Sequence, residues 1–149
     1  NDDSMDGCGS LRRQENPMDW IAHSRNLANP TTKLDNWVHA TQLVCVRKSD
    51  QRIVGMIQVR HYMNEYLRDY AGHIGYSVRP SERKKGYATW MLKNVLGYCK
   101  ALGINEVFVS CLDTNEASRR TILANHGVYQ NTVYEPEEKI NLERYIISI

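Results

Sequence analysis

A short basic segment of this chain has the residue types that bind phosphate. Residues 83–88 read Arg-Lys-Lys-Gly-Tyr-Ala and lie between a stretch typical of a β-strand and a stretch typical of an α-helix. The first N–H groups of a helix have no partner within it, and the helix start carries partial positive charge. Gly86 and the small Ala88 let a ligand approach the backbone closely. The segment therefore predicts a phosphate or diphosphate site, to which three cations add formal charge: Arg83, Lys84 and Lys85.

The elements around this segment place it at the end of a strand. Residues 72–79 are rich in β-branched and aromatic side chains, which predicts a strand. After the segment, apolar side chains recur at helical spacing and stop before Gly103, which predicts a helix. A buried strand over 106–112 follows, and a strand–helix–strand unit of this kind is a right-handed crossover with parallel strands. Ligands bind at the carboxyl ends of such strands, where the basic segment lies.

The rest of the chain predicts one domain, residues 1–149, without internal repeats. The polar residues 1–16 are expected to form a loop or to be disordered. Residues 62–70 are expected to be a polar, aromatic loop. The other expected elements are a short helix over 16–24, strands over 43–47 and 53–60, a helix over 115–126, and strands over 128–134 and 142–149.

Composition narrows the class of protein. The chain has 149 residues, 42% of them hydrophobic, and a net charge of +2, which is ordinary for a globular domain and weak for a nucleic-acid binder. No apolar run approaches the roughly 20 residues that span a bilayer. The four cysteines form no C-x-x-C pair, so zinc and redox motifs are absent and buried thiols in a cytoplasmic protein are expected: Cys8, Cys45, Cys99 and Cys111.

Two segments carry a family resemblance. Residues 72–80 followed by 83–88 resemble motif A of the GNAT superfamily of N-acetyltransferases, and residues 115–127 resemble its motif B. The likeness extends over about 40–149 and is strongest to predicted bacterial acetyltransferases. It implies an α/β (mixed α+β) GNAT fold with a mostly antiparallel sheet of about six strands, helices on both faces, and a splay between strands 72–79 and 106–112. It also implies that the usual N-terminal strand is missing here.

The resemblance implies that acetyl-CoA lies in that V-shaped opening as a cosubstrate, with no metal. The main chain from Tyr76 to Val78 would bond the pantetheine arm as an added strand does. N–H groups from Lys84 through Thr89 would hold the diphosphate, and Asn115 and Ser118 would lie near the arm. The implied coenzyme-binding residues are Tyr76, Ser77, Val78, Arg83, Lys84, Lys85, Gly86, Tyr87, Ala88, Thr89, Asn115 and Ser118.

Acetyl transfer to an amine needs a base, an N–H donor for the oxyanion and, in many cases, a proton for the thiolate. The N–H of Tyr76 or Val78 suits the second need. The family often uses a tyrosine seven residues after the motif B asparagine for the third, but Ile122 stands there. Tyr134 is the first stand-in, with Tyr87, Tyr129 and unassisted departure of the thiolate left open. Glu65 and His73 are the first base candidates in a cluster with His61 and Asp69.

The sequence therefore predicts an acetyl-CoA-dependent N-acetyltransferase acting on a primary amine of a small molecule or peptide. The alternative is a non-catalytic acyl-CoA-binding or regulatory module, suggested by Ile122. A generic nucleotide binder would share the basic segment, but the P-loop pattern is absent. Strands 128–134 and 142–149 could pair in a homodimer. Two acidic groups could attract a cationic acceptor or simply be solvated: Asp2, Asp3 and Asp6, and Glu135, Glu137 and Glu138.

Overall fold

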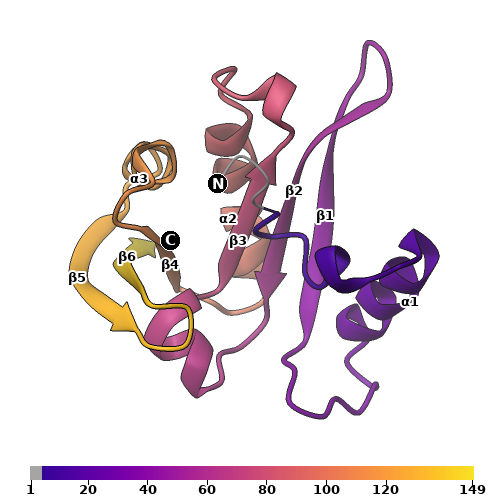
Figure 1. Cartoon of the computed structure of the whole chain (residues 1–149), viewed down its shortest axis with the longest axis horizontal. Helices are drawn as coiled ribbons and strands as arrows, with labels where there is room; N and C mark the ends of the chain where they lie inside the picture. The colour runs from indigo at the N-terminus through magenta and orange to yellow at the C-terminus, as the bar shows by residue number, and fades with distance from the viewer. Residues whose placement is uncertain (1–4) are drawn as a thin grey trace.

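The computed structural model describes residues 5–149 and is built on one six-stranded sheet (Figure 1). The strand order is β1-β2-β3-β4-β6-β5. The strands are β1 (Ala40–Arg47), β2 (Arg52–Arg60), β3 (Ile74–Val78), β4 (Glu106–Leu112), β5 (Val128–Glu135) and β6 (Ile140–Ser148). The helices are α1 (Pro17–Ala28), α2 (Tyr87–Ala101) and α3 (Glu116–Leu123), with short turns η1 (Leu11–Arg13), η2 (Leu67–Ala71) and η3 (Pro80–Glu82).

The sheet opens between its two central strands. All other neighbouring strands are antiparallel, whereas β3 and β4 are parallel and pair only at Ile74 and Val109. Just before β3, the His73 N–H donates to the Phe108 carbonyl at 2.7 Å and closes that end. Beyond this point the two strands diverge, so the mixed, mostly antiparallel sheet with a splay between these strands is confirmed.

Helices cover both faces of the sheet, as predicted. A Cβ at Gly55 would lie 2.8 Å from Cε of Met91, so β2 and α2 approach closely on one face. Gln42 and Gln58 pair across β1 and β2 and face the opposite side, where the segment before α1 lies. The core between the sheet and α2 is apolar and includes Val54, Ile57, Val59, Leu92, Val95, Cys99, Val107 and Val109.

The segment before α1 packs against β3 instead of being solvated. Residues 1–4, including Asp2 and Asp3, lie outside the described residues. Cys8 is buried, and its Sγ lies 3.1 Å from Oγ of Ser77. Gly7 has a φ of +71°, and a Cβ there would lie 2.1 Å from the Gly75 carbonyl oxygen, so only glycine fits. The segment expected to be loop or disordered thus forms one wall beside the splay.

Two other regions differ from the sequence-based expectation. Part of the expected loop over 62–70 forms the π-helical turn η2, capped by an Asn64 side chain that accepts from the Leu67 N–H at 2.9 Å. Strand β6 lies between β4 and β5, so it is already paired on both sides and cannot add a strand across a dimer. Within residues 5–149, no helix combines the length and apolar character that crossing a bilayer requires.

Candidate active site

The main chain of β3 offers hydrogen-bonding groups to the splay. Next to β3, the Arg60 N–H donates to the His73 carbonyl at 2.8 Å and the Arg79 N–H donates to the Val54 carbonyl at 2.9 Å. Hydrogen-bonded pairs recur at every second residue of an antiparallel ladder. Gly75 and Ser77 therefore also direct their main-chain groups at β2.

The alternating residues Tyr76 and Val78 direct their N–H and C=O groups toward the splay. One of these groups is already engaged, because the Val78 carbonyl accepts from Nε of Arg83 at 3.3 Å. The main chain predicted to bind the pantetheine arm is thus narrowed to Tyr76 and Val78. Ser77 does not fit that role, since its main chain faces β2 and its hydroxyl contacts Cys8.

The start of α2 has open N–H groups at the carboxyl end of β3. Gly86 is the N-cap with a φ of +82°, and the first i to i−4 bond of the helix runs from the Trp90 N–H to the Gly86 carbonyl at 3.0 Å. A Cβ at Gly86 would meet nothing within 4 Å, so the space in front of the turn is open. The N–H groups of Tyr87, Ala88 and Thr89 can therefore receive an anion.

The basic side chains of this loop differ in what they contact. The buried carboxylate of Glu82 accepts from Nζ of Lys85 at 2.8 Å and from Nη1 of Arg47 at 2.9 Å. These bonds, that of Lys85 first, lower the pKa of Glu82. Lys85 thus anchors η3 under the loop, whereas Lys84 is exposed with a φ of +62°. The Lys85 contribution to a diphosphate would come from its main chain.

The helix of motif B, α3, contacts β3 through the side chain of Tyr76. Asn115 is the N-cap of α3, and its Oδ1 accepts from the Ser118 N–H at 3.0 Å. The Tyr76 hydroxyl lies 2.7 Å from Oγ of Ser118, so the strand and the helix meet beside the splay. Burial raises the pKa of Tyr76 above its usual value. Asn115, Ser118 and Tyr76 were each predicted, but their direct contact was not.

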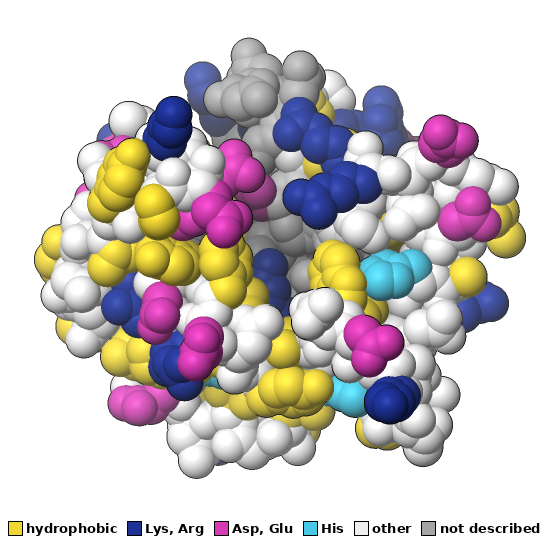
Figure 2. Space-filling view, turned by 60° about the horizontal axis from the view of Figure 1, so that its bottom comes forward, with side chains coloured by type: hydrophobic (Ala, Val, Ile, Leu, Met, Phe, Trp, Pro, Cys, Tyr) yellow, Lys and Arg dark blue, Asp and Glu magenta, His cyan; other side chains and the backbone are white. Residues whose placement is uncertain are grey.

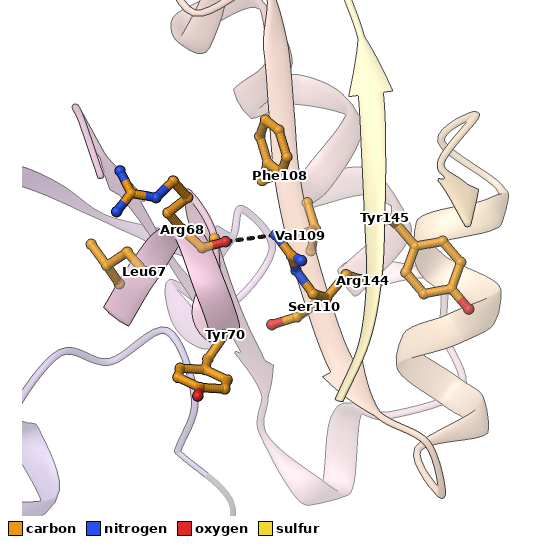
Figure 3. A pocket seen from close by; sticks show the side chains of 9 residues that line it. Leu67, Arg68, Tyr70, Phe108, Val109, Ser110, Arg144 and Tyr145 are labelled. Carbon is orange, nitrogen blue, oxygen red and sulfur yellow. Dashed lines mark hydrogen bonds between the residues drawn. The ribbon is translucent and has the colours of Figure 1, made fainter. Parts of the chain in front are cut away.

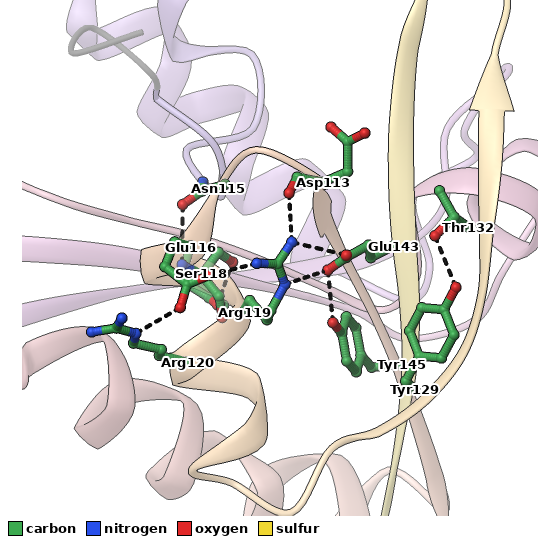
Figure 4. Close-up of polar contacts among 11 residues, drawn as sticks. Asp113, Asn115, Glu116, Ser118, Arg119, Arg120, Tyr129, Thr132, Glu143 and Tyr145 are labelled. Carbon is green, nitrogen blue, oxygen red and sulfur yellow. Dashed lines mark hydrogen bonds and ion pairs between the residues drawn. The ribbon is translucent and has the colours of Figure 1, made fainter.

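A polar network holds the start of α3 in place (Figure 4). Nε and Nη2 of Arg119 donate to the two carboxylate oxygens of Glu143 on β6, each at 2.8 Å. The Tyr145 hydroxyl donates to the same carboxylate at 2.7 Å, and Arg119 also contacts Glu116 and the Asp113 carbonyl. The sequence held no signal for this network, because its members lie on separate elements.

Glu143→Gln is expected to lower the melting temperature at pH 7 by a few degrees, and this deficit is expected to shrink as the pH falls toward 3. Hydrogen bonds from Arg119, the largest cause, hold the pKa of Glu143 below its usual value. A lowered carboxyl pKa stabilises the fold above the unfolded pKa, and this stabilisation is lost as the pH falls through the folded pKa. Melting curves at pH 7, 5 and 3 check this, and a deficit of the same size at pH 3 contradicts it.

At the closed end of the splay, His73 is part of the scaffold. Its Nδ1 accepts from the Phe108 N–H at 3.0 Å, so the neutral ring carries its proton on Nε2. Burial first, then the nearby Arg60, lower the pKa of His73. Nη1 of Arg60 in turn donates to the Gly72 carbonyl at 3.0 Å. His73 has no free lone pair for a substrate proton, and this geometry favours a positioning role.

The turn η2 lies next to His73 at the same closed end of the splay. Nη2 of Arg144 donates to the Arg68 carbonyl at 2.6 Å and closes a cavity of about 10 Å³ over β4 (Figure 3). The rings of Tyr66 and Tyr70 lie 5.4 Å apart. Glu65 is exposed, directly before Tyr66. Figure 2 shows a hollow on this face with acidic side chains on one side, basic side chains on the other, and hydrophobic side chains on both.

The turn between β5 and β6 brings acidic side chains close to η2. Burial first, then Glu135, Glu138 and Glu137, raise the pKa of Tyr66, which places the acidic turn within electrostatic range of η2. The buried carboxylate of Glu135 accepts from the N–H groups of Glu137 at 3.1 Å and Glu138 at 2.6 Å. The acidic turn therefore lies near η2, and Asp6 of the other predicted acidic group acts electrostatically on the neighbouring Arg60.

Neither position 122 nor the predicted stand-in Tyr134 offers a proton donor that lines the splay. Ile122 is fully buried in the core, where its Cγ2 would be 2.3 Å from a Cβ at Gly127. Tyr134 is 58% exposed on β5, which is separated from β4 by β6. Its role stays a prediction. Among residues 5–149, no three or more His, Cys, Asp or Glu side chains gather into a group that could hold a metal ion.

Comparisons with known proteins agree with this architecture. The chain is similar to ribosomal-protein-S5-alanine acetyltransferase from Vibrio fischeri, with a TM-score of 0.62, 18% identity, and coverage of 88% of this chain and 67% of that one. YncA from Salmonella typhimurium, solved with its cofactor acetyl-CoA, gives a TM-score of 0.65, 13% identity, and coverage of 90% and 72%. A variant of the spermidine N-acetyltransferase SpeG from Vibrio cholerae gives a TM-score of 0.60 and 14% identity, with coverage of 95% of this chain and 90% of that one.

At these identities the solved structures show the fold. None of the curated proteins compared with the chain matches it in sequence. Residues 2–127 match the family described as the acetyltransferase (GNAT) domain, which is most of the chain. The splayed sheet, the open N–H groups at the start of α2 and this match agree, and the chain belongs to the GNAT family of acetyltransferases, which use acetyl-CoA.

Proposed function

We propose that the chain moves the acetyl group of acetyl-CoA to a primary amine that is positively charged at neutral pH, by direct attack of the amine. The observation that carries this proposal is the splay between β3 and β4. Tyr76 and Val78 turn main-chain groups toward it, and the open start of α2 lies at its wide end. These groups fit a long ligand with a peptide-like arm and a diphosphate.

The acidic turn supports a cationic acceptor. Glu135, Glu137 and Glu138 act electrostatically on Tyr66 directly before η2, so an approaching ammonium group would be attracted to this side. The hydroxyphenyl rings of Tyr66 and Tyr70 add a surface that suits cations and alkyl chains. Two of the compared structures are named for acting on spermidine and on an alanine of a ribosomal protein, and both acceptors are amines.

We assign the base role to Glu65 and the oxyanion donor to the N–H of Tyr76 or Val78. Two other candidates near η2 suit the base role less well than Glu65, because their basic atoms are already engaged. Nδ1 of His73 is engaged by Phe108, and both Glu135 oxygens accept main-chain N–H groups. Glu65 keeps its carboxylate exposed and next to Tyr66. The proton donor predicted at Tyr134 would have to act from the outer strand β5.

An amine screen read by free-thiol release tests the proposal. We expect turnover of spermidine and of a peptide with a free N-terminal alanine, and at least about tenfold lower kcat/KM for a peptide whose first residues are acidic. Titration calorimetry with coenzyme A runs beside it. Binding without turnover of any amine would favour the non-catalytic acyl-CoA-binding module suggested by Ile122, and the absence of binding would contradict both functions.

We also propose a bacterial, cytoplasmic enzyme. The compared acetyltransferases come from Vibrio and Salmonella, and four cysteines that are buried and free suit a reducing compartment. A homodimer would use β5, an edge strand that exposes Val128 and Tyr134. Sedimentation of the purified protein checks the oligomeric state.

A further inference from the structure

The site holds a phenol that the sequence pattern does not assign to proton chemistry. The Tyr76 hydroxyl lies 2.7 Å from Oγ of Ser118 and 3.3 Å from the Ser118 carbonyl oxygen. The side chain of Tyr76 points to α3, while its own main-chain groups face the splay. Tyr76 thus faces the position proposed for the pantetheine arm with its main chain and contacts α3 with its side chain.

The surroundings of this pair are closely packed. Thr121 and Cys111 act on the pKa of Tyr76, and Ser118 is a hydrogen-bond partner of the Cys111 thiol. Ile122 lies one turn after Ser118 and is fully buried. Helix α3 thus carries an apolar side chain at position 122, and the phenol of Tyr76 from β3 lies against the same helix at Ser118.

We propose that Tyr76 and Ser118 form a hydrogen-bond chain that stabilises the departing thiolate of coenzyme A. The Tyr76 O–H donates to Oγ of Ser118, and the Ser118 O–H turns from the Cys111 thiol to donate to the coenzyme sulfur. As the amine nitrogen bonds to the acetyl carbon, the C–S bond breaks and its electron pair stays on sulfur. The thiolate takes its proton from water after release, and the ammonium proton leaves through the base. This inference rests on the proposed function.

Stabilisation without proton transfer follows from the acidities. A thiol of pKa near 8.5 is a stronger acid than an ordinary phenol, and burial raises the pKa of Tyr76 further. Transfer of the phenolic proton to the thiolate would thus be uphill. Hydrogen bonds in a chain polarise one another, and a bond to a charged acceptor is stronger than a neutral one. Ser118 therefore touches the leaving group, and Tyr76 is a positioning residue that acts through it.

A double-mutant cycle tests the proposal on the whole chain. Ser118→Ala is expected to lower kcat roughly 10- to 100-fold, and Tyr76→Phe about tenfold, with the Kd of acetyl-CoA changed less than threefold. In the Ser118→Ala background, Tyr76→Phe is expected to have no further effect, because its partner is gone. Tyr98→Phe removes an exposed phenol on α2 that contacts Thr41 on β1, and it serves as the matched control.

Several results would contradict the proposed hydrogen-bond chain through Tyr76 and Ser118. These are an unchanged kcat in Tyr76→Phe, equal losses in both backgrounds, or a rise in the acetyl-CoA Kd that accounts for the whole effect. A lower kcat in Tyr134→Phe with an unchanged kcat in Tyr76→Phe would assign the interaction with the thiolate to Tyr134 on β5. Should Tyr76→Phe fail to fold in melting curves, Ser118→Thr and Ser118→Ala decide, since only threonine keeps the hydroxyl. Wild type that binds coenzyme A but acetylates no amine would instead contradict the proposed function.

Discussion

Ala88→Asp is expected to weaken coenzyme A binding at least about 100-fold while leaving the fold as stable as before. Ala88 is half-buried in the first turn of α2, among the N–H groups that have no helical partner. A carboxylate in a first turn stabilises a helix by roughly 0.3–1 kcal/mol. The same carboxylate would occupy the N–H groups and repel a diphosphate, and at 4 Å two like charges near a protein surface repel by about 4 kcal/mol.

The isosteric variant Ala88→Asn is the control for this experiment. It fills the same volume without charge, so the difference in Kd between the two variants isolates electrostatics. We expect titration calorimetry to show that this difference shrinks as salt rises from about 0.05 to 0.5 M, because salt screens exposed charges. Equal binding by the Asp and Asn variants would contradict a diphosphate site at the start of α2.

Glu65→Gln is expected to lower kcat/KM roughly 100-fold or more at pH 7, which is a common loss for a general base. Glutamine has the same shape as glutamate but cannot take the proton of the acceptor ammonium. The loss should become smaller toward pH 9.5, since a growing share of the amine is then already neutral. Measurements of kcat/KM for the best amine between pH 6.5 and 9.5 check both expectations.

Asp69→Asn, in the neighbouring turn η2, provides the matched control. Asp69 lies four residues on and is paired with Nε of Arg68 at 3.7 Å, so its loss should change kcat/KM less than threefold. A Glu65→Gln variant with wild-type activity would move the base to another group. A loss that is constant across the pH range would indicate that Glu65 binds the acceptor without accepting its proton.

Much of the fold could be predicted because the signals are local. The strand over 106–112 coincides with β4, and the apolar stripe that stops before Gly103 corresponds to α2. Gly86 takes the left-handed conformation that a turn into a helix requires. Each of these features depends on residues within a few positions in the chain, so propensity, periodicity and turn chemistry determine them.

The site was predicted less completely, because polar side chains found their partners across the chain. Arg47 bonds to Glu82, Nδ1 of His73 to the Phe108 N–H, and Tyr76 to Ser118. The segment before α1, which was expected to be loop or disordered, packs against β3, since the backbone of Gly7 fits against Gly75. No pattern in the sequence encodes these distances.

The prediction that residues 83–88 bind a diphosphate needs no tertiary information, because an N–H-rich helix start and its glycine are local properties. Only the tertiary structure decided that Tyr76 and Val78, but not Ser77, turn their main chains toward the splay. That choice depends on which residues of β3 are hydrogen-bonded to β2, and a shift of one residue in this pairing would reverse it.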